Sequence, residues 1–183
     1  VQRTQVEILD TFDLKSSKLI RYMTKQRKID YDLLMMYCCE VQFRFPNGKH
    51  KDYVYNAVGF ENVLHGYELR TDFWKISTDK KCYSKINGNN NGTAAIFEGF
   101  ISFLSALKML GISKFEEDAY IMNGVGLLNI VTPFLPNEIN CYTDNDNAGD
   151  NVIKTLQEKG FKINDCRGLY SGYNDANNKL DTL

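Results

Sequence analysis

The stretch that decides the fold is INCYTDNDNAGD, residues 139–150, in which an apolar run leads directly into three acidic positions. The apolar residues predict a strand, and Ala148-Gly149 permits the tight turn from a strand into a helix. Alternate side chains of an extended segment point the same way, so Asp144 and Asp146 can converge on one ion. Asp150 falls in the first helical turn, where the helix dipole favours a negative charge, and is not counted as a ligand. Taken alone, the motif is explained about equally well as a polar loop, because Asn, Asp and Gly dominate turns.

A second strand also ends in an acidic residue, because Ala94-Ala95-Ile96-Phe97 is followed by Glu98-Gly99. Carboxylates at the C-terminal ends of parallel strands lie on the rim where open α/β sheets bind ligands. Oxygen ligands of this kind suit Mg²⁺ or Mn²⁺, the ions that hold and activate phosphates. The sequence therefore predicts a divalent-metal site that includes Glu98, Asp144 and Asp146.

Strand and helix patterns alternate through the second half of the chain. The segment from Phe100 to Leu110 is apolar almost throughout, which predicts a buried helix that ends at Gly111. A strand, a helix, a strand, a helix and a strand follow at 119–122, 127–134, 138–143, 148–159 and 161–164. This alternation indicates the α/β fold class, with a Rossmann-like sheet of mainly parallel strands, right-handed crossovers and flanking helices.

The first half of the chain has a different pattern. Residues 17–62 predict two helices, the second at 31–40, then a strand at 41–45, a turn at 46–48 and a strand from 53 to 60. These elements indicate a smaller α+β subdomain ahead of the α/β sheet, and we place the boundary between residues 90 and 91. With 183 residues, 43% of them hydrophobic, the chain is long enough to fold as one or two compact units.

The acidic strand ends resemble the Toprim domain, which is shared by bacterial primases, topoisomerases, recombination-mediator proteins and overcoming-lysogeny-type nucleases. The matching pieces follow three successive strands: Phe97-Glu98-Gly99, Met122-Asn123-Gly124-Val125-Gly126 and Tyr142 to Gly149. The stretch from Ser171 to Asn178 is similar to an acidic motif further along in bacterial primases, which adds Asp175 as a metal ligand. The resemblance covers residues 91–183 and implies a Toprim-type sheet. The subdomain at 1–90 resembles the one that precedes Toprim in primases, most closely in the primase-like proteins of Bacteroides-type mobile elements.

This resemblance implies a DNA primase-like nucleotidyltransferase that makes short RNA primers on a single-stranded DNA template from nucleoside triphosphates. Glu98, Asp144 and Asp146 would be catalytic, and Asp175 would help them to hold Mg²⁺ or Mn²⁺. Two positions depart from the pattern: Ser102 stands where primases often have an acidic residue, and Asn177 stands where a second Asp is common. These departures leave two alternatives open, a non-catalytic DNA-binding accessory in plasmid or transposon mobilisation and a Toprim nuclease or topoisomerase fragment.

Basic side chains in the first half are the candidate DNA contacts. Residues 1–90 carry 15 Lys and Arg against 11 Asp and Glu, whereas residues 91–183 carry 7 against 12. A basic half suits template phosphates, although a mixed solvated surface explains the small excess nearly as well. Aromatic residues lie between the basic ones and could stack on unpaired bases, but core packing is the more common role of a residue such as Trp74. The predicted contacts are Arg70, Lys75, Lys81 and Lys85, and the run from Lys25 to Lys28 is interpreted as a solvated helix end.

The cysteines and the lack of a long apolar run indicate a cytoplasmic protein with no membrane partner. The five cysteines include no Cys-x-x-Cys pair, and neither His50 nor His65 has the spacing of a zinc ligand. Because primases of the resembled kind begin with a zinc-binding module, we expect this chain to start at the domain that follows it. The resemblance also implies a helicase or mobilisation proteins as candidate partners.

Overall fold

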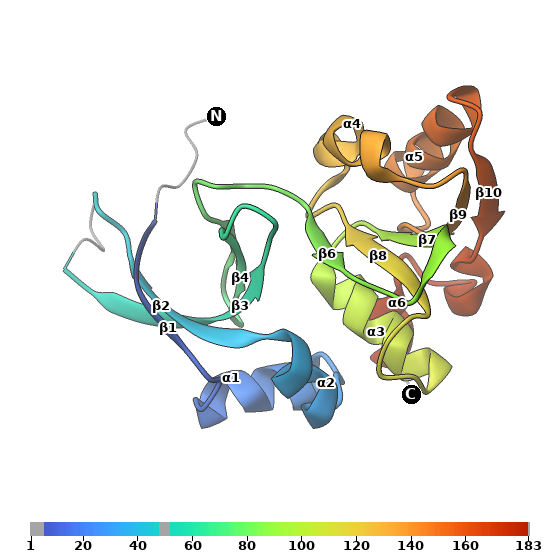
Figure 1. The fold of residues 1–183 in the computed structure, drawn as a ribbon. Helices are drawn as coiled ribbons and strands as arrows, with labels where there is room; N and C mark the ends of the chain where they lie inside the picture. The colour runs from blue at the N-terminus through green and yellow to red at the C-terminus, as the bar shows by residue number, and fades with distance from the viewer. Residues whose placement is uncertain (1–5, 48–51, 183) are drawn as a thin grey trace. The chain divides into compact units, whose positions relative to one another are not determined.

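The computed structural model describes residues 6–47 and 52–182, which pack into two compact units (Figure 1). The first unit ends at Cys82 and the second begins at Tyr83, except that the short segment Arg27–Ile29 packs with the second unit. By this packing, residues 83–90 belong with the second unit, and the predicted domain boundary between residues 90 and 91 stays a prediction. Among the described residues, no helix is both long enough and apolar enough to cross a bilayer.

The first unit contains a five-stranded antiparallel sheet with helices beside it (Figure 1). The strands are neighbours in chain order: β1 (Glu7–Phe12), β2 (Cys39–Arg44), β3 (Val54–Glu61), β4 (Tyr67–Arg70) and β5 (Lys75–Ser77). Helix α1 (Ser17–Arg21) continues as a π-helical segment (Tyr22–Gln26), and α2 (Tyr31–Tyr37) precedes β2. The predicted α+β character of this half is confirmed; Gly48 of the predicted turn and His50 lie outside the described residues.

The second unit contains a five-stranded sheet in the order β10-β9-β7-β8-β6. The strands are β6 (Ser84–Ile86), β7 (Asn90–Phe97), β8 (Glu117–Ile121), β9 (Glu138–Tyr142) and β10 (Lys162–Asp165). All pairings are parallel except that of β6 with β8. The predicted fold class, an α/β sheet of mainly parallel strands, is confirmed.

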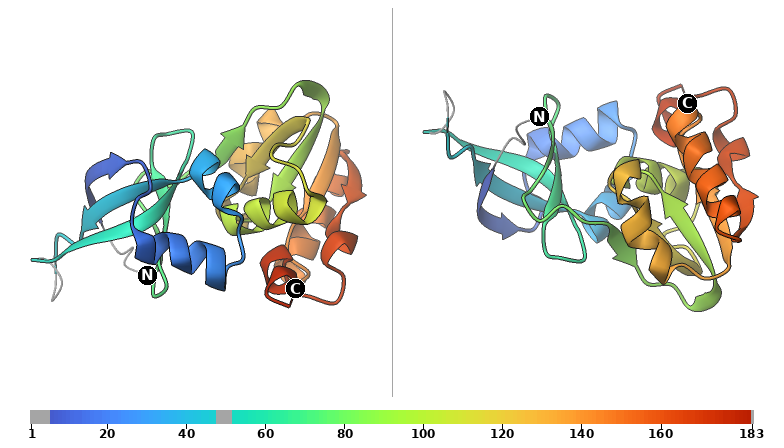
Figure 2. Two further views of the ribbon diagram at one scale, coloured as in Figure 1. Left: turned by 90° about the horizontal axis from the view of Figure 1, so that it is seen from below. Right: turned by 90° about the horizontal axis from the view of Figure 1, so that it is seen from above.

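Helices cover both faces of this sheet (Figures 1 and 2). Helices α3 (Phe100–Leu110) and α6 (Ala176–Leu180) lie on one face, and α4 (Leu128–Val131) and α5 (Asn147–Glu158) lie on the other. A strand covered on both faces must be apolar along its length rather than alternating. This requirement explains the run Ala94-Ala95-Ile96-Phe97 at the end of β7, where all four side chains are buried. Gly111 ends α3 in the left-handed conformation, with φ of 66°.

The segment predicted as one helix at 127–134 is divided into three short pieces. A 3₁₀ turn (Val125–Leu127) leads into α4, and a second 3₁₀ turn (Thr132–Phe134) follows it. Pro133 explains the end of α4, because proline lacks the backbone N–H that would continue an α-helix and its ring collides with the preceding turn. The chain therefore crosses this face of the sheet with a short, irregular connection.

Gly149 lets α5 begin directly against the loop that carries Asp144. A Cβ atom at this buried position would overlap the carbonyl oxygen of Asp144 and approach Thr143 Oγ1 within 3.1 Å. We therefore expect Gly149→Ala to lower the free energy of unfolding by about 1–3 kcal/mol, as overpacking does elsewhere. Urea unfolding measures this change. Gly126→Ala is the matched control, because a Cβ there meets nothing within 4 Å. Equal stability of Gly149→Ala and the wild type would contradict the close approach.

Candidate active site at the carboxyl edge of the parallel sheet

The carboxyl ends of the four parallel strands meet at one edge of the second sheet. Phe97 at the end of β7 pairs with Ile121 of β8 and Tyr142 of β9, while Asp165 at the end of β10 pairs with Cys141 of β9. Neighbouring strands lie about 4.8 Å apart, so the residues just beyond these ends line the same edge. In strand order from β10 to β8, they are Arg167, Asp144, Glu98 and Asn123.

Glu98 is half-buried directly after β7, and its backbone is fixed by the loop that follows β8. The carbonyl oxygens of Phe97 and Glu98 accept hydrogen bonds from the N–H groups of Met122 (2.8 Å) and Gly124 (2.9 Å). Asn123 adopts a left-handed backbone with φ of 57° and donates its side-chain amide to Ser84 Oγ at 3.0 Å. The segment from Met122 to Gly126, which the sequence singled out, therefore holds Glu98 at the sheet edge.

Asp144 lies two residues beyond β9, on the strand next to the one that carries Glu98. The strand predicted at 138–143 ends one residue earlier, because β9 ends at Tyr142. The carbonyl of Thr143 accepts a hydrogen bond from the Tyr170 hydroxyl at 2.6 Å instead of pairing with a strand. The two aspartates consequently belong to a loop that turns into α5.

Asp146 is the N-cap of α5 and has a structural task of its own. Its Oδ1 atom accepts the N–H groups of Ala148 and Gly149, both at 2.9 Å. Capping satisfies N–H groups that a helix start leaves without intrahelical partners. Of the two carboxylate oxygens, Oδ2 is therefore the one that could contact an ion.

Asn145, between the two aspartates, binds the loop that precedes α6. Its N–H donates to the Asn174 carbonyl at 2.6 Å, and its side-chain amide donates to the Tyr173 carbonyl at 2.8 Å and the Tyr170 carbonyl at 3.4 Å. Asn145 was not among the predicted site residues, although its place between two predicted ligands could have suggested a role. Its amide closes the acidic loop onto a second motif.

Asp175 is brought to the acidic loop by this closure, because it directly follows Asn174. The hydrogen bond between residues 145 and 174 limits the Cα atoms of Asp144 and Asp175 to a separation of about 8 Å or less, by standard backbone dimensions. Asp175 also caps α6, since its Oδ1 accepts the N–H of Asn178 at 2.8 Å. The structure thus brings Asp144, Asp146 and Asp175 into one neighbourhood while using one oxygen of each capping residue.

Arg167, just after β10, belongs to the same edge and was not predicted. Its guanidinium contacts Asp165 at 2.8 Å and Asp150 at 2.7 Å, and it reaches the Asp144 carbonyl at 3.4 Å. The hydrogen bonds that the guanidinium donates to Asp165, followed by the one it donates to Asp150, raise the pKa of Arg167, although its partial burial opposes the charge. The position of Arg167 beyond a predicted strand was the sequence signal that could have found it.

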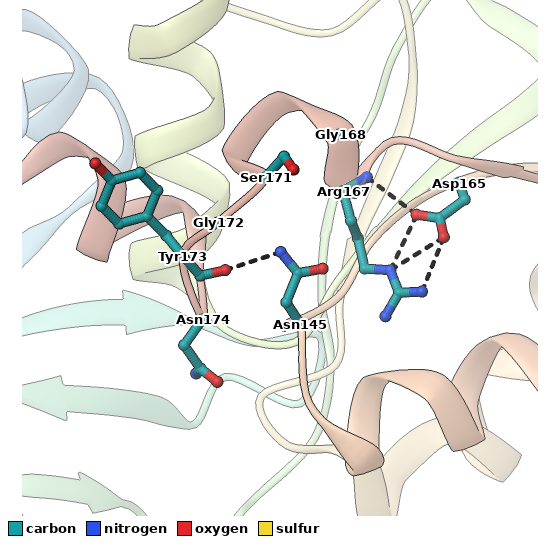
Figure 3. A pocket seen from close by; sticks show the side chains of 8 residues that line it. All are labelled: Asn145, Asp165, Arg167, Gly168, Ser171, Gly172, Tyr173 and Asn174. Atoms are coloured by element: carbon teal, nitrogen blue, oxygen red, sulfur yellow. Dashed lines mark hydrogen bonds and ion pairs between the residues drawn. The ribbon is translucent and has the colours of Figure 1, made fainter.

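A polar cavity of about 690 Å³ opens beside Asn145 and Arg167 (Figure 3). Amides, hydroxyls, glycine backbone and the Arg167–Asp165 ion pair line it: Asn145, Asp165, Arg167, Gly168, Ser171, Gly172, Tyr173 and Asn174. Figure 3 shows the Asn145 amide directed at the Tyr173 carbonyl and the Arg167 guanidinium directed at Asp165. A lining of this kind suits a ligand that has many hydrogen-bonding groups.

The acidic residues fit a metal ion that a substrate helps to bind, rather than a closed protein cage. Over residues 6–47 and 52–182, no three Asp, Glu, His or Cys side chains are grouped so that they could hold a metal ion. Glu98 and Asp144 remain the pair that adjacent strands bring to one edge. Mg²⁺ commonly keeps several waters and is held by one or two carboxylates together with substrate phosphates. The donor set is therefore compatible with Mg²⁺ or Mn²⁺ in the presence of a phosphate ligand.

Asn177, one of the two departures from the Toprim pattern, is explained by packing. It is 3% exposed, and its amide donates to the Arg27 carbonyl at 2.7 Å and to Ser105 Oγ at 3.1 Å. Its Oδ1 accepts a hydrogen bond from Arg27 at 3.3 Å. A deprotonated aspartate could not donate the first two bonds. The predicted solvated helix end is therefore wrong for Arg27, which is half-buried, whereas Lys25 and Lys28 are exposed. Ser102, the other departure from the Toprim pattern, is half-buried on α3.

Three of the four predicted DNA contacts gather around a buried carboxylate in the first unit. Glu68 on β4 is 5% exposed, and its Oε2 accepts the Ser77 hydroxyl at 2.8 Å. Burial raises the pKa of Glu68, while the Ser77 hydrogen bond and the charges of Lys81, Lys75 and Arg70 oppose that rise. The charges of these three basic residues therefore act on one site, although one negative charge partly offsets them.

Lys85, the fourth predicted DNA contact, lies in the second unit and is engaged within the protein. Its ammonium is 2.7 Å from Asp118 Oδ2 and 5.4 Å from the centroid of the Tyr120 ring. The hydrogen bond that its ammonium donates to Asp118 raises the pKa of Lys85. Asp118 already pairs with this charge, and the role of Lys85 as a DNA contact stays a prediction.

Comparison with protein families agrees with this geometry. A family model described as "Toprim-like" matches residues 95–180, and a model described as "Domain of unknown function (DUF8464)" matches residues 8–79. No curated protein matches the sequence. The predicted Toprim resemblance is confirmed for the second unit, while the mobile-element origin stays a prediction.

Comparison with solved structures finds one primase fragment with a similar fold and two structures with lower scores. The primase fragment of the bacteriophage T7 primase-helicase protein has a TM-score of 0.55 and 13% identity, covering 83% of this chain and 66% of that chain. A bacteriophage T7 lagging-strand DNA polymerase complex with gp4 primase domains has a TM-score of 0.49 and 12% identity, covering 75% of this chain and 74% of that chain. The Aquifex aeolicus primase, with its zinc-binding and RNA polymerase domains, has a TM-score of 0.43 and 14% identity, covering 83% of this chain and 43% of that chain. At these identities the likeness to the first structure shows the fold alone, and this chain spans 66% of that structure's length.

The closure of the acidic loop depends on the Asn145 side chain. We expect Asn145→Ala to lower the free energy of unfolding by about 1 kcal/mol, the net value of a lost hydrogen bond, and to speed amide exchange across residues 170–174. Hydrogen-exchange mass spectrometry measures the local effect. Asn151→Ala, at an exposed position on α5, should leave exchange in this loop unchanged. Wild-type exchange in Asn145→Ala would refute the role of this amide.

The raised pKa of Glu68 predicts a pH-dependent stability. The folded state holds the Glu68 proton more tightly than the unfolded state, so this stabilisation is complete below the unfolded pKa of about 4.3. It is lost as the pH rises through the folded pKa. We therefore expect the wild type to lose stability relative to Glu68→Gln as the pH increases from about 4 towards neutrality, measured by urea unfolding at each pH. Glu116→Gln, at an exposed glutamate, should keep the wild-type profile. Parallel profiles for the wild type and Glu68→Gln would exclude the effect.

Proposed function

We propose that the Toprim domain at residues 95–180 is the catalytic part of a primase-like nucleotidyltransferase, which joins ribonucleotides on a single-stranded DNA template. One observation carries this proposal. Glu98 and Asp144 follow neighbouring parallel strands of a Toprim-like domain and share their edge with a polar cavity. Carboxylates in such a position suit the binding of nucleotide phosphates through a divalent ion.

Glu98 and Asp144 are the proposed principal ligands of Mg²⁺ or Mn²⁺. When bound, the ion would neutralise phosphate charge and help to align a 3'-hydroxyl with the α-phosphate. Asp146, through Oδ2, and Asp175 would contact the ion or its waters while they continue to cap α5 and α6. Glu98 has a second proposed role, acceptance of the hydroxyl proton, which requires it to come within hydrogen-bond reach of the nucleophile.

The cavity beside Asn145 is the proposed place for the sugar and base of a nucleoside triphosphate. Its volume of about 690 Å³ lies within the usual range of small-molecule sites. The amides of Asn145 and Asn174 and the Ser171 hydroxyl would supply hydrogen bonds to such a ligand. Because Asn145 lies between Asp144 and Asp146, a nucleotide here could direct its phosphates towards the acidic loop.

Arg70, Lys75 and Lys81 are the proposed contacts to template phosphates. Their three positive charges, taken with the one negative charge of ionised Glu68, leave a net charge of two positive units around that site. Cations of this kind bind nucleic acid through phosphate neutralisation and counterion release. The aromatic residues near them are treated separately below.

A helicase is the proposed protein partner, because the structurally similar T7 fragment belongs to a primase-helicase protein. Mobilisation proteins are the second candidate partners, and a cytoplasmic location is part of the same proposal. The partners and the location are proposals about the whole protein, because this chain spans only part of the length of the T7 fragment.

The alternative function is a non-catalytic DNA-binding accessory. Two observations favour it: the described residues contain no group of three metal-ligating side chains, and Asn177 is committed to packing where a second acidic residue is common. In that case the acidic loop would keep its capping role without chemistry. A Toprim nuclease would use the same carboxylates for strand cleavage instead.

Synthesis of oligoribonucleotides tests the proposal directly. With single-stranded DNA, ribonucleoside triphosphates and Mn²⁺ or Mg²⁺, we expect the chain to make short RNA products. Glu98→Gln and Asp144→Asn should each reduce product by about 100-fold or more, because they remove charge with little change of volume. Glu116→Gln, an exposed glutamate on another loop, is the matched control and should retain synthesis.

Three outcomes separate the alternatives. Binding of single-stranded DNA without synthesis under either metal would overturn the enzyme proposal in favour of the accessory. Metal-dependent degradation of the DNA would favour the nuclease. Synthesis at the wild-type rate by Glu98→Gln would remove Glu98 from the catalytic residues.

A further inference from the structure

We propose that the first unit holds unpaired bases of single-stranded DNA in an aromatic groove beside the turn between β4 and β5. The groove has a volume of about 440 Å³ and is formed by the start of α1, the start of β3 and the turn at 71–74. Three aromatic side chains line it: Tyr55, Phe73 and Trp74. All of its residues belong to the first unit, which matches a family model described as a domain of unknown function.

The turn that presents two of these rings is held by hydrogen bonds. Thr71 Oγ1 accepts the N–H groups of Phe73 at 3.0 Å and Trp74 at 2.9 Å. The Thr71 N–H in turn donates to the Trp74 carbonyl at 3.0 Å. A fixed platform loses little conformational freedom when a ligand stacks on it, which favours binding.

Core packing accounts for Trp74 and leaves Phe73 unexplained. The Trp74 ring is 4.8 Å from Tyr55 and 5.4 Å from Phe45, in edge-to-face arrangements, and it packs against the core cluster of this unit. The predicted packing role of Trp74 is therefore confirmed. Phe73, by contrast, is 76% exposed, and its groove neighbour Val54 is 54% exposed. The groove thus combines an anchored ring with an exposed one, both available to a flat apolar ligand.

A cation beside the exposed ring matches the phosphate that accompanies every base. Lys18 Nζ lies 5.2 Å from the centroid of the Phe73 ring and 3.6 Å from Asp72 Oδ2, and its side chain is 69% exposed. An exposed ion pair of this length is weak, so Lys18 can exchange Asp72 for a phosphate. Arg70 and Lys75, which pair across β4 and β5, adjoin the two ends of the turn.

Single-stranded DNA is the partner that uses both features. Its unpaired bases offer flat faces for stacking, and its backbone places a phosphate beside each base. Duplex DNA keeps its bases inside the stack, and an apolar peptide would leave the three cations unused. This site does not rest on the proposed nucleotidyl transfer, because it lies wholly in the first unit and requires neither metal nor nucleotide.

Trp74 makes the site directly observable, because it is the only tryptophan in the chain. We expect a short oligothymidylate to quench its fluorescence in a saturable, salt-sensitive manner, with no metal or nucleotide present. Phe73→Ala should weaken binding by about 5- to 150-fold, the usual effect of removing one stacked base contact. Phe73→Tyr should bind like the wild type, whereas Phe73→Leu, which is apolar without a ring, should be as weak as Phe73→Ala.

Matched controls separate this groove from general effects. Phe134→Ala removes a phenylalanine that is 57% exposed in the second unit and should leave affinity unchanged. Lys18→Gln should reduce the slope of log affinity against log salt by about 0.7, the value for one single-strand phosphate contact, while Lys25→Gln should not. Because Phe73 and Lys18 are both exposed, these variants are expected to keep the wild-type melting temperature.

The absence of quenching by oligothymidylate would overturn the proposal and leave the groove for a protein partner. Wild-type affinity in Phe73→Ala, or equal quenching by duplex DNA, would also overturn it. Failure here would not affect the nucleotidyl-transfer proposal, whose assay depends on metal, nucleotides and Glu98. Loss of synthesis in Glu98→Gln with full Trp74 quenching would show that the two sites act separately.

Discussion

The parallel pairing of β7 with β8 and β9 is the constraint on which the candidate active site depends. Their register places Phe97 beside Ile121 and Tyr142, so Glu98 and the loop with Asp144 must emerge at the same edge. The central strand β7 must be apolar, since helices cover both faces of the sheet. Glu98 and Asp144 therefore lie beyond the strand ends, where water and ligands can reach them. Burial of the sheet and exposure of the carboxylates are two results of the same pairing.

Most of the second unit was predictable from sequence because its signals are local. Apolar runs that end in Glu98 or Asp144 define strands and their direction, and Gly111 marks a helix end through its left-handed backbone. The prediction of one helix at 127–134 was wrong because it rested on the apolar pattern and neglected Pro133, whose missing N–H interrupts the helix. The placement of Arg27–Ile29 with the second unit was not predictable, since it involves hydrogen bonds between Arg27 and the distant Asn177.

The site was predictable in its acidic residues and not in the contacts that position them. Asp146 and Asp175 were expected only as ligands, and the structure shows each also capping a helix. Asn145 and Arg167 organise the loop through bonds to residues that are 17 to 29 positions away, which no short motif records. The basic residues illustrate the same limit: Lys85 pairs with Asp118, and Arg70, Lys75 and Lys81 surround Glu68. Partners of this kind come from sheet register, which sequence spacing does not specify.

The most direct test of the central claim is the position of a bound ion. Anomalous diffraction at the manganese edge, from crystals of the chain grown with Mn²⁺ and a nucleoside triphosphate, would locate it without any assumption about activity. The account predicts a peak at the carboxyl edge of the second sheet, with oxygens of Glu98 and Asp144 within about 2.2 Å of the metal, close to ordinary ligand distances. A peak held by other residues, or full nucleotide occupancy with no manganese at this edge, would contradict it.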